Sequence, residues 1–342
     1  THAQSLLLSV ATRLALLAQT RIEHPMSTNT LLTLAADIGG TNTRVALLDG
    51  TVLRAETVTR YENAKSKNLE YILRHYVTAQ GAKPDAVSLA LAGPVENGAG
   101  RLTNLDWAID TASACKATGG ADAFLLNDLQ AQGHALPFLS PDALTRVQTG
   151  ETGATYAPCL MIGIGTGLNV APVHRIASHT YVPAAEAGHI SFSARDEALS
   201  AFERDLEARL GHVAAEDIMS GRGLERAYRH LTDQELAASK IMALCGTGDQ
   251  DADVATGLLI RALGHFSGDM ALTHLPTGGI FLVGGVARAL LPYMAQHGFQ
   301  TCIADKGRFS DFMSQFAIHV VQDDYAALIG AASYAQECIG PC

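Results

Sequence analysis

A pattern of strand, glycine turn and strand that occurs twice constrains the fold most strongly. In the first copy, the runs LLTLAAD, RVALLDG and TVLRAETVTR follow one another over Leu31–Arg60, with a turn at Gly39–Gly40. In the second copy, CLMIGIGTG, LNVAPVHRI and HTYVPA fill Cys159–Ala184. The first copy enters its third run through Asp-Gly, a strong hairpin signal, and we interpret both copies as three-stranded meanders. Asp37–Gly39 aligns with Gly163–Gly165, which indicates an internal duplication.

Strands and helices alternate in the remainder of the chain. The predicted strands are Asp85–Val95, Ala121–Asp128 and Gly278–Val286. The predicted helices are Lys67–Gln80, Asp251–His274 and Tyr325–Glu337, with a helix-rich segment over Asp196–Leu244. Such alternation implies partly parallel sheets covered by helices on both faces. Since 342 residues suffice for about two domains, we expect two α/β lobes with a cleft between them.

Charge and missing motifs exclude several classes of protein. The chain has 24 Lys and Arg against 34 Asp and Glu, a net charge of −10, so general electrostatic binding of nucleic acid or anionic lipid is not expected. Neither a P-loop motif nor a Rossmann glycine fingerprint after a strand is present. A phosphate ligand must therefore be bound locally. No later segment has 18 uninterrupted apolar residues, which favours a cytoplasmic protein without a membrane anchor.

The two ends of the chain differ from its middle. Leu6–Ala18 is apolar, but Arg13 interrupts it and no basic segment precedes it, unlike a signal peptide. We expect residues 1–26 to be an extension outside the fold. Cys338 and Cys342 are separated by three residues without a second ligand pair, so we interpret them as free thiols rather than a metal site.

The glycine turns are the candidate phosphate sites. DIGGTN begins at Asp37 and GIGTGL begins at Gly163. Successive N–H groups and a Thr hydroxyl in such turns can hold phosphate oxygens without a lysine. Asp37, at a strand end, would be a hard oxygen ligand for Mg²⁺, directly or through water. The alternative is that each turn needs glycine for its geometry alone, and repetition in both halves favours the phosphate interpretation.

Polar residues beside other predicted elements carry two interpretations each. Asn127–Asp128 follows a strand and precedes a helix, where position alone favours a helix N-cap over a catalytic base. Glu186 and His189 have the spacing of a di-iron helix motif, but no second copy exists, and together they suit recognition of sugar hydroxyls. Glu216, taken alone, is interpreted as a solvated charge on a helix face. Gly284–Gly285 fits either a strand-end turn or a flat surface for a nucleotide base.

Taken together, these elements resemble the sugar kinase branch of the actin/hexokinase/heat-shock ATPase superfamily. Within it, the chain is similar to the bacterial glucokinase family of the enterobacterial type, from about Leu31 to the C-terminus. The matching segments are LAGPV (91–95), TNLDW (103–107), LLND (125–128), EAGH (186–189), GHVAAEDIMSG (211–221), GGV (284–286) and DKGRF (305–309). The related repressor/ORF/kinase family follows E-x-G-H with a cysteine-rich zinc site, whereas this chain has SFSARDEALSAF, so no structural zinc is expected.

The resemblance implies an actin-like, ribonuclease H-like fold of two lobes, each a mixed sheet flanked by helices, that binds ATP, Mg²⁺ and D-glucose in the cleft between them. It assigns residues 27–138 plus 328–342 to a small lobe and 139–327 to a large one, and it suggests a homodimer. The implied sugar-binding residues are Asn127, Asp128, Glu186, His189 and Glu216, with Asp128 as the base for the 6-hydroxyl. The implied nucleotide-binding residues are Asp37, Gly39, Gly40, Thr41, Asn42, Gly165, Thr166, Gly167, Gly284 and Gly285. Asp37 is the implied metal ligand.

Two alternatives remain at this stage. One is a kinase for another hexose, such as fructose or mannose, from the same superfamily. The other is a sugar-responsive regulator without turnover, although the residues before Met26 are too few and too weakly basic for a helix-turn-helix. Ala187 departs from the enterobacterial pattern, which tends to have glycine there, and its methyl group lies in the predicted sugar segment.

Overall fold

The computed structural model describes residues 30–102, 105–151, 153–177 and 179–340. The predicted extension at residues 1–26, part of the TNLDW segment and Cys342 lie outside the described residues. In the described part, no helix is both long and apolar enough to cross a membrane, and its five cysteines are free thiols.

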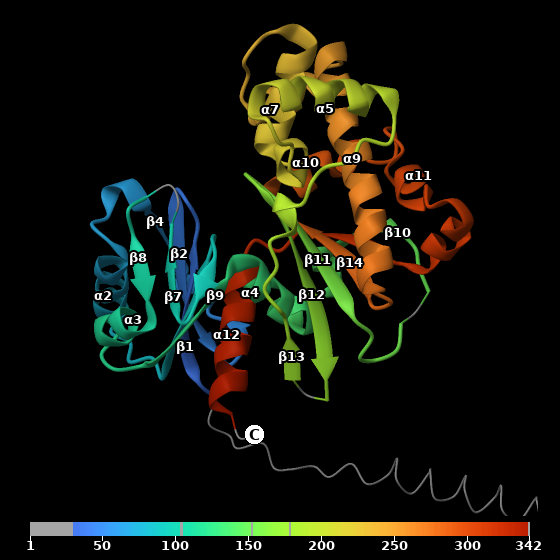
Figure 1. Cartoon of the computed structure of the whole chain (residues 1–342). Coiled ribbons are helices and arrows are strands. Elements are labelled where there is room, and N and C mark those ends of the chain that lie inside the picture. Colours follow the sequence, from blue (N-terminus) through green and yellow to red (C-terminus); the bar gives the residue numbers. More distant parts are fainter. Residues whose placement is uncertain (1–29, 103–104, 152, 178, 341–342) are drawn as a thin grey trace, which may run out of the picture. The chain divides into compact units, whose positions relative to one another are not determined.

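Two six-stranded sheets form the framework (Figure 1). The first consists of β1 (Leu32–Ile38), β2 (Asn42–Asp49), β3 (Val52–Leu53), β4 (Thr59–Glu62), β5 (Ala86–Leu91) and β9 (Asp122–Asn127). The second consists of β10 (Leu144–Gln148), β11 (Cys159–Ile164), β12 (Leu168–Ile176), β13 (His179–Tyr181), β14 (Gly279–Val283) and β15 (Ile318–Val321). A small third sheet contains β6 (Val95–Glu96), β7 (Ala99–Arg101) and β8 (Ala108–Asp110).

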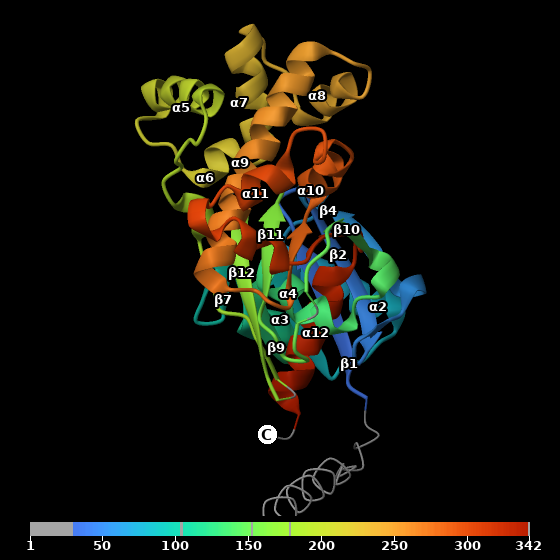
Figure 2. The ribbon, with the colours of Figure 1, turned by 90° about the vertical axis from the view of Figure 1, so that its right-hand side faces the viewer.

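Helices connect and cover these sheets. Those in the described part are α2 (Leu69–Gln80), α3 (Thr111–Ala117), α4 (Asp128–Ala135), α5 (Glu197–Leu210), α6 (Ala215–Ile218), α7 (Gly221–Thr232), α8 (Ala238–Cys245), α9 (Gln250–His274), α10 (Gly285–Leu290), α11 (Phe299–Ala304) and α12 (Ala326–Ile339). Figure 2 shows α5, α7 and α8 gathered beside α9, and all three contact it. Their apolar faces join the core of the second sheet through buried side chains such as Phe202, Leu224 and Ile241.

The duplication predicted from the glycine turns is confirmed by the strand order. In the first sheet, β1 pairs antiparallel with β2 and parallel with β5, which pairs parallel with β9. In the second sheet, β11 pairs antiparallel with β12 and parallel with β14, which pairs parallel with β15. The two halves therefore place the same kind of turn, between β1 and β2 and between β11 and β12, at equivalent positions.

Helices α4 and α12 pack closely against each other. Each follows the last parallel strand of its half: α4 follows β9, and α12 follows β15. Figure 1 shows α12, in red, between the two sheets, where it contacts β1 and β5 while α4 contacts β11 and β12. Alanines line the contact, and a Cβ on Gly330 would lie 1.6 Å from the carbonyl oxygen of Ala131. Glycine at position 330 is thus required by the approach of the two helices.

Several predicted boundaries were wrong. The third run of the first meander is interrupted by a 3-10 turn at Ala55–Thr57, so β3 and β4 pair with β2 separately. The strand expected over Gly278–Val286 ends at Val283, because Gly284, at φ 104°, caps α10. The strand expected over Asp85–Val95 ends at Leu91, and the one expected to Asp128 ends at Asn127. The third sheet and strands β10 and β15 were missed.

Candidate functional site

A pocket of about 550 Å³ opens where several strands of both sheets end. Its walls come from the segments that follow β5, β9, β11 and β14, namely Ala92–Pro94, Asn127–Asp128, Gly165–Gly167 and Gly284. Open α/β sheets bind ligands at the carboxyl ends of their strands, because the loops there leave a crevice. The pocket therefore occupies the position in which this fold places its ligands.

Most of the residues predicted for the site lie together here. The pocket is lined by Asn127, Asp128, Gly165, Thr166, Gly167, Glu186, His189, Glu216 and Gly284. The predicted residues outside its lining are Asp37, Gly39, Gly40, Thr41, Asn42 and Gly285. Asp37 nevertheless lies near enough to Asp128 to raise the pKa of that carboxyl. The lining also includes Gln132, Asn169 and Arg222, which sequence reasoning missed.

Sequence position left open whether Asn127–Asp128 serves as a helix cap or as a catalytic base, and the two residues differ in this respect. Asn127 is the N-cap of α4: its Oδ1 accepts from the N–H of Leu129 at 2.9 Å, and Gln130 completes a capping box. Its Nδ2 donates to the carbonyl of Gly93, which joins the segment after β5 to the start of α4. Asp128 is the first residue of the helix and is not the cap, so its carboxyl group is available for chemistry.

The carboxyl group of Asp128 is poised to exchange a proton near neutral pH. Its pKa is raised from 3.8 to about 7, mainly by burial and in smaller part by the neighbouring carboxyls of Asp37 and Glu186. The N–H of Leu129 donates to Oδ1 at 2.8 Å and opposes this rise. The backbone N–H of Asp128 itself also opposes the rise. A general base works best with a pKa near the working pH, and Asp128 meets that condition.

The segment Glu186–His189 is fixed by backbone contacts with β12. Asn169 on β12 donates from Nδ2 to the carbonyl of Ala185 and accepts from the N–H of Ala187. Ala187–His189 forms a single 3-10 turn rather than an α-helix. A Cβ on Gly188 would lie 2.0 Å from the carbonyl oxygen of Leu168, so only glycine fits there. The exposed side chains of Glu186 and His189 line the pocket, away from this anchored backbone.

Glu216 lies in the short helix α6 beside that segment. The N–H of Ala215 donates to the carbonyl of Ile190 at 2.8 Å, which ties the start of α6 to the residue after His189. The side chain of Glu216 is 20% exposed, and its Oε1 accepts from Arg222 at 3.2 Å. A Cβ on Gly167 would lie 2.6 Å from Oε2. Glu216 is therefore packed against the β11–β12 turn, not solvated on a helix face.

Two glycines in the turns are not explained by turn geometry alone. Gly39 and Gly165 do not have positive φ. A Cβ on Gly165 would meet no protein atom within 4 Å, and one on Gly39 would make only an ordinary contact. The N–H groups of both glycines close their own turns, at 3.0 Å to Asn42 and 2.9 Å to Gly167. Space beside the backbone of Gly165 suits close approach by a ligand, as the phosphate interpretation requires.

Asp37 has the donor chemistry of a magnesium ligand. It pairs with Arg44 across the β1–β2 ladder, and Arg44 Nη1 lies 3.8 Å from Oδ2. Burial raises the pKa of Asp37, and Arg44 opposes that rise. In the described part of the chain, no group of three or more His, Cys, Asp or Glu side chains is arranged to hold a metal. Mg²⁺ commonly takes one or two carboxylates with phosphate and water oxygens, so Asp37 fits a metal that arrives with a nucleotide.

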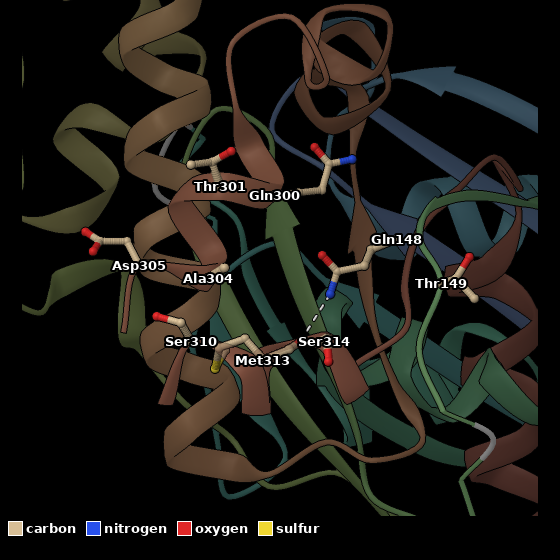
Figure 3. Close-up of a pocket in the computed structure, with 9 residues that line it drawn as sticks. All are labelled: Gln148, Thr149, Gln300, Thr301, Ala304, Asp305, Ser310, Met313 and Ser314. Atoms are coloured by element: carbon tan, nitrogen blue, oxygen red, sulfur yellow. Dashed lines mark hydrogen bonds between the residues drawn. The ribbon is translucent and has the colours of Figure 1, made fainter. Parts of the chain in front are cut away.

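A second hollow lies beside α11 and β10, and Figure 3 shows its lining. Several of its polar groups are used within the protein. Gln148 donates to the carbonyls of Met313 and Phe316, and Ser310 and Ser314 donate to carbonyls three residues earlier. This hollow lacks the convergent carboxylates of the strand-end pocket, which we treat as the candidate active site.

Duplicated sheets with equivalent glycine turns and a pocket at their strand ends place this chain in the class of proteins with the actin-like ATPase fold. A family model described as Glucokinase matches residues 34–338. The chain belongs to the glucokinase family.

Individual relatives agree with this assignment over most of their length. The glucokinase of Erwinia tasmaniensis is 31% identical over 90% of this chain and 98% of its own. The glucokinase of a Caulobacter species, strain K31, is 34% identical over 88% of this chain and 94% of its own. Among solved structures, glucokinase from an Antarctic psychrotroph is 29% identical with a TM-score of 0.78, covering 89% of this chain and 98% of that one. The family resemblance and the fold class expected from the sequence are confirmed.

Proposed function

We propose that this chain transfers the γ-phosphoryl group of ATP to the 6-hydroxyl of D-glucose, giving glucose 6-phosphate and ADP. The observation that carries the proposal is Asp128, a carboxyl group with a pKa of about 7 inside the strand-end pocket. Phosphoryl transfer needs positioning, charge stabilisation and a group that accepts the proton of the attacking hydroxyl. Membership of the glucokinase family supports the choice of glucose and ATP.

Asp128 would act as the base through Oδ2, since Oδ1 already accepts from Leu129. The proton of the 6-hydroxyl passes to this carboxylate as O6 bonds to the γ-phosphorus. The bond from that phosphorus to the bridging oxygen breaks, and ADP leaves with the electron pair. Only the ionised form of Asp128 accepts the proton, so its protonation state controls the step.

Glucose would be held by the polar side chains around Asp128. We assign this role to Asn127, Glu186, His189 and Glu216, which line the same pocket from three separate segments. Specificity would follow because a missing or inverted hydroxyl leaves one of these groups without a partner, a loss of about 1–3 kcal/mol each.

The nucleotide would lie along the two glycine turns and against Gly284 and Gly285. Because Gly39 and Gly165 use their own N–H groups, we assign phosphate donation to the backbones of Gly40, Thr41, Thr166 and Gly167 and to the Thr hydroxyls. Asn42, which follows the first turn, completes the set. Mg²⁺ would neutralise charge on the phosphate oxygens, and Asp37 is the carboxylate proposed to hold it.

Further proposals concern the whole chain. We propose a small lobe at residues 27–138 plus 328–342 and a large lobe at 139–327, whose closure over the sugar expels water and limits ATP hydrolysis. We also propose a homodimer that works in the cytoplasm, where ATP is available. Size-exclusion chromatography with light scattering tests the dimer, for which the mass should be twice 36.0 kDa.

A panel of donors and acceptors tests the function directly. ATP, ADP and polyphosphate are combined with glucose, mannose and fructose, and sugar phosphate is quantified. The expected result is the highest kcat/KM with ATP and glucose. A higher value with fructose or mannose would assign the chain to another hexose. Binding of glucose without turnover, together with a DNA gel shift, would instead support a sugar-responsive regulator.

A further inference from the structure

Arg222 is the second residue of α7, and its side chain extends back to the β11–β12 turn. Its Nε donates to the carbonyl of Thr166 at 3.0 Å, and its Nη2 donates to Oε1 of Glu216 at 3.2 Å. The helix start is fixed to the same turn, since the N–H of Gly221 donates to the carbonyl of Gly165 at 2.8 Å. Arg222 therefore links the proposed phosphate turn to a proposed sugar ligand.

The pocket around Arg222 has charged side chains that are mainly acidic. Its lining carries the carboxyl groups of Asp128, Glu186 and Glu216, and Asp37 lies nearby. Among the described lining residues, Arg222 is the one arginine or lysine. A nucleotide triphosphate brings several negative charges, which these carboxylates repel. The sequence has no P-loop lysine, so a fixed cation at the pocket would add to the N–H donors and Mg²⁺ in offsetting this repulsion.

The guanidinium of Arg222 has donors left for a ligand. It carries five N–H donors, of which two bond to Thr166 and Glu216. No described residue accepts from Nη1, and the side chain is 57% exposed. Further along α7, Arg229 pairs with Glu235 and does not line the pocket. Arg222 thus differs from Arg229 in lying at the pocket, with donors left over from its bonds to the turn and Glu216.

We infer that Arg222 is the phosphate-binding cation of this site. Thr166 and Glu216 hold the guanidinium between the turn and the sugar position, and its remaining N–H groups bind the terminal phosphoryl oxygens of the nucleotide. Because arginine can donate two parallel hydrogen bonds to a phosphate, it fixes the direction of the γ-phosphoryl group as well as offsetting its charge. This inference rests on the proposed function and assigns it one further residue.

Binding of two nucleotides to the full-length variants tests the inference. Arg222→Met removes the charge but keeps a long side chain, Arg222→Lys keeps the charge, and Arg229→Met is the control that removes an ion pair from the same helix. Calorimetry measures Kd for AMPPNP, AMP and glucose. Arg222→Met should weaken AMPPNP binding about ten-fold or more, as expected for a lost charged hydrogen bond. AMP and glucose should each change by less than about two-fold, because neither carries a γ-phosphoryl group.

The other variants complete the comparison. Arg222→Lys should recover part of the AMPPNP affinity, and Arg229→Met should bind like the parent chain. Unchanged AMPPNP affinity in Arg222→Met would overturn the inference. Equal losses for AMP and AMPPNP, or a larger loss for glucose, would also overturn it, since Arg222 would then act only through the turn or Glu216. If the parent chain phosphorylates glucose in these cases, the proposed function stands while the role of Arg222 falls.

Discussion

Replacing Asp128 by Asn should stabilise the protein at alkaline pH while removing its activity. The pKa of Asp128 is raised from 3.8 to about 7 in the folded state. The folded chain therefore binds the proton more tightly than the unfolded chain between about pH 4 and pH 7, and stability present at low pH is lost as pH rises through this window. Asn carries no charge to bury and can still accept from the N–H of Leu129 through Oδ1.

The structure sets the size of this effect. A rise of about three pKa units corresponds to about 4 kcal/mol at pH 8, at about 1.4 kcal/mol per unit. Asp128 keeps partial exposure to solvent, which screens the charge. We therefore expect Asp128→Asn to gain about 2 kcal/mol at pH 8. At pH 4.5 the gain should fall to about a quarter of that value, because folded Asp128 is already protonated.

Urea unfolding of both chains at pH 4.5 and pH 8 measures the difference. Asp122→Asn, at the exposed start of the same strand β9, is the matched control and should leave the stability nearly unchanged at both pH values. A gain that is equal at the two pH values, or absent at pH 8, would refute the assignment of a buried, destabilised charge to Asp128. If Asp128→Asn abolishes turnover but brings no gain in stability, the role of Asp128 as a base stands. Burial of its charge would then no longer explain its raised pKa.

Three further outcomes follow from the geometry. The kcat/KM for glucose should decrease as pH falls through about 7, since only ionised Asp128 accepts the proton; a flat profile from pH 6 to pH 8 would contradict its role as a base. Gly330→Ala should destabilise the chain by about 3 kcal/mol or more in urea unfolding, because the new Cβ meets the Ala131 backbone, whereas Gly285→Ala, with open space, should change stability by less than about 1 kcal/mol. Gly165→Ala should leave stability within about 1 kcal/mol but raise the KM for ATP; lost stability with unchanged KM would favour a purely structural turn.

Local signals explain which parts of the fold were predictable. The meanders were recognised because hairpin residues and alternating runs lie within a few positions of each other, as at Gly39–Gly40. The strands β10 and β15 were missed, because they are short and pair with each other from distant parts of the chain. The end of β14 at Val283 was misplaced, since the turn at Gly284 depends on contact with Ile164 from another strand.

The same distinction, between local signals and contacts with distant parts of the chain, applies to the candidate site. Asp128 was a candidate because a carboxylate directly after an apolar strand is visible in the sequence, but position alone favoured a helix cap, and the family resemblance reversed that preference. Glu216 taken alone gave no functional signal, and its pocket position depends on the bond from Ala215 to Ile190. Arg222 was missed, although it lies within the SGRGL run that follows Glu216, because nothing local shows that its side chain extends to Thr166.

The sequence by itself determined the duplicated strand–turn–strand units, the absence of a P-loop and the identity of the residues at the strand ends. Tertiary structure decided where those residues lie and what surrounds them. It buried Asp128 and brought Asp37 and Glu186 near it, which together raise the pKa of Asp128 to about 7, and it set Arg222 against the second glycine turn. The physical reason is that turn and strand preferences act between neighbours in the chain, whereas desolvation and charge interactions depend on distances in space that only packing fixes.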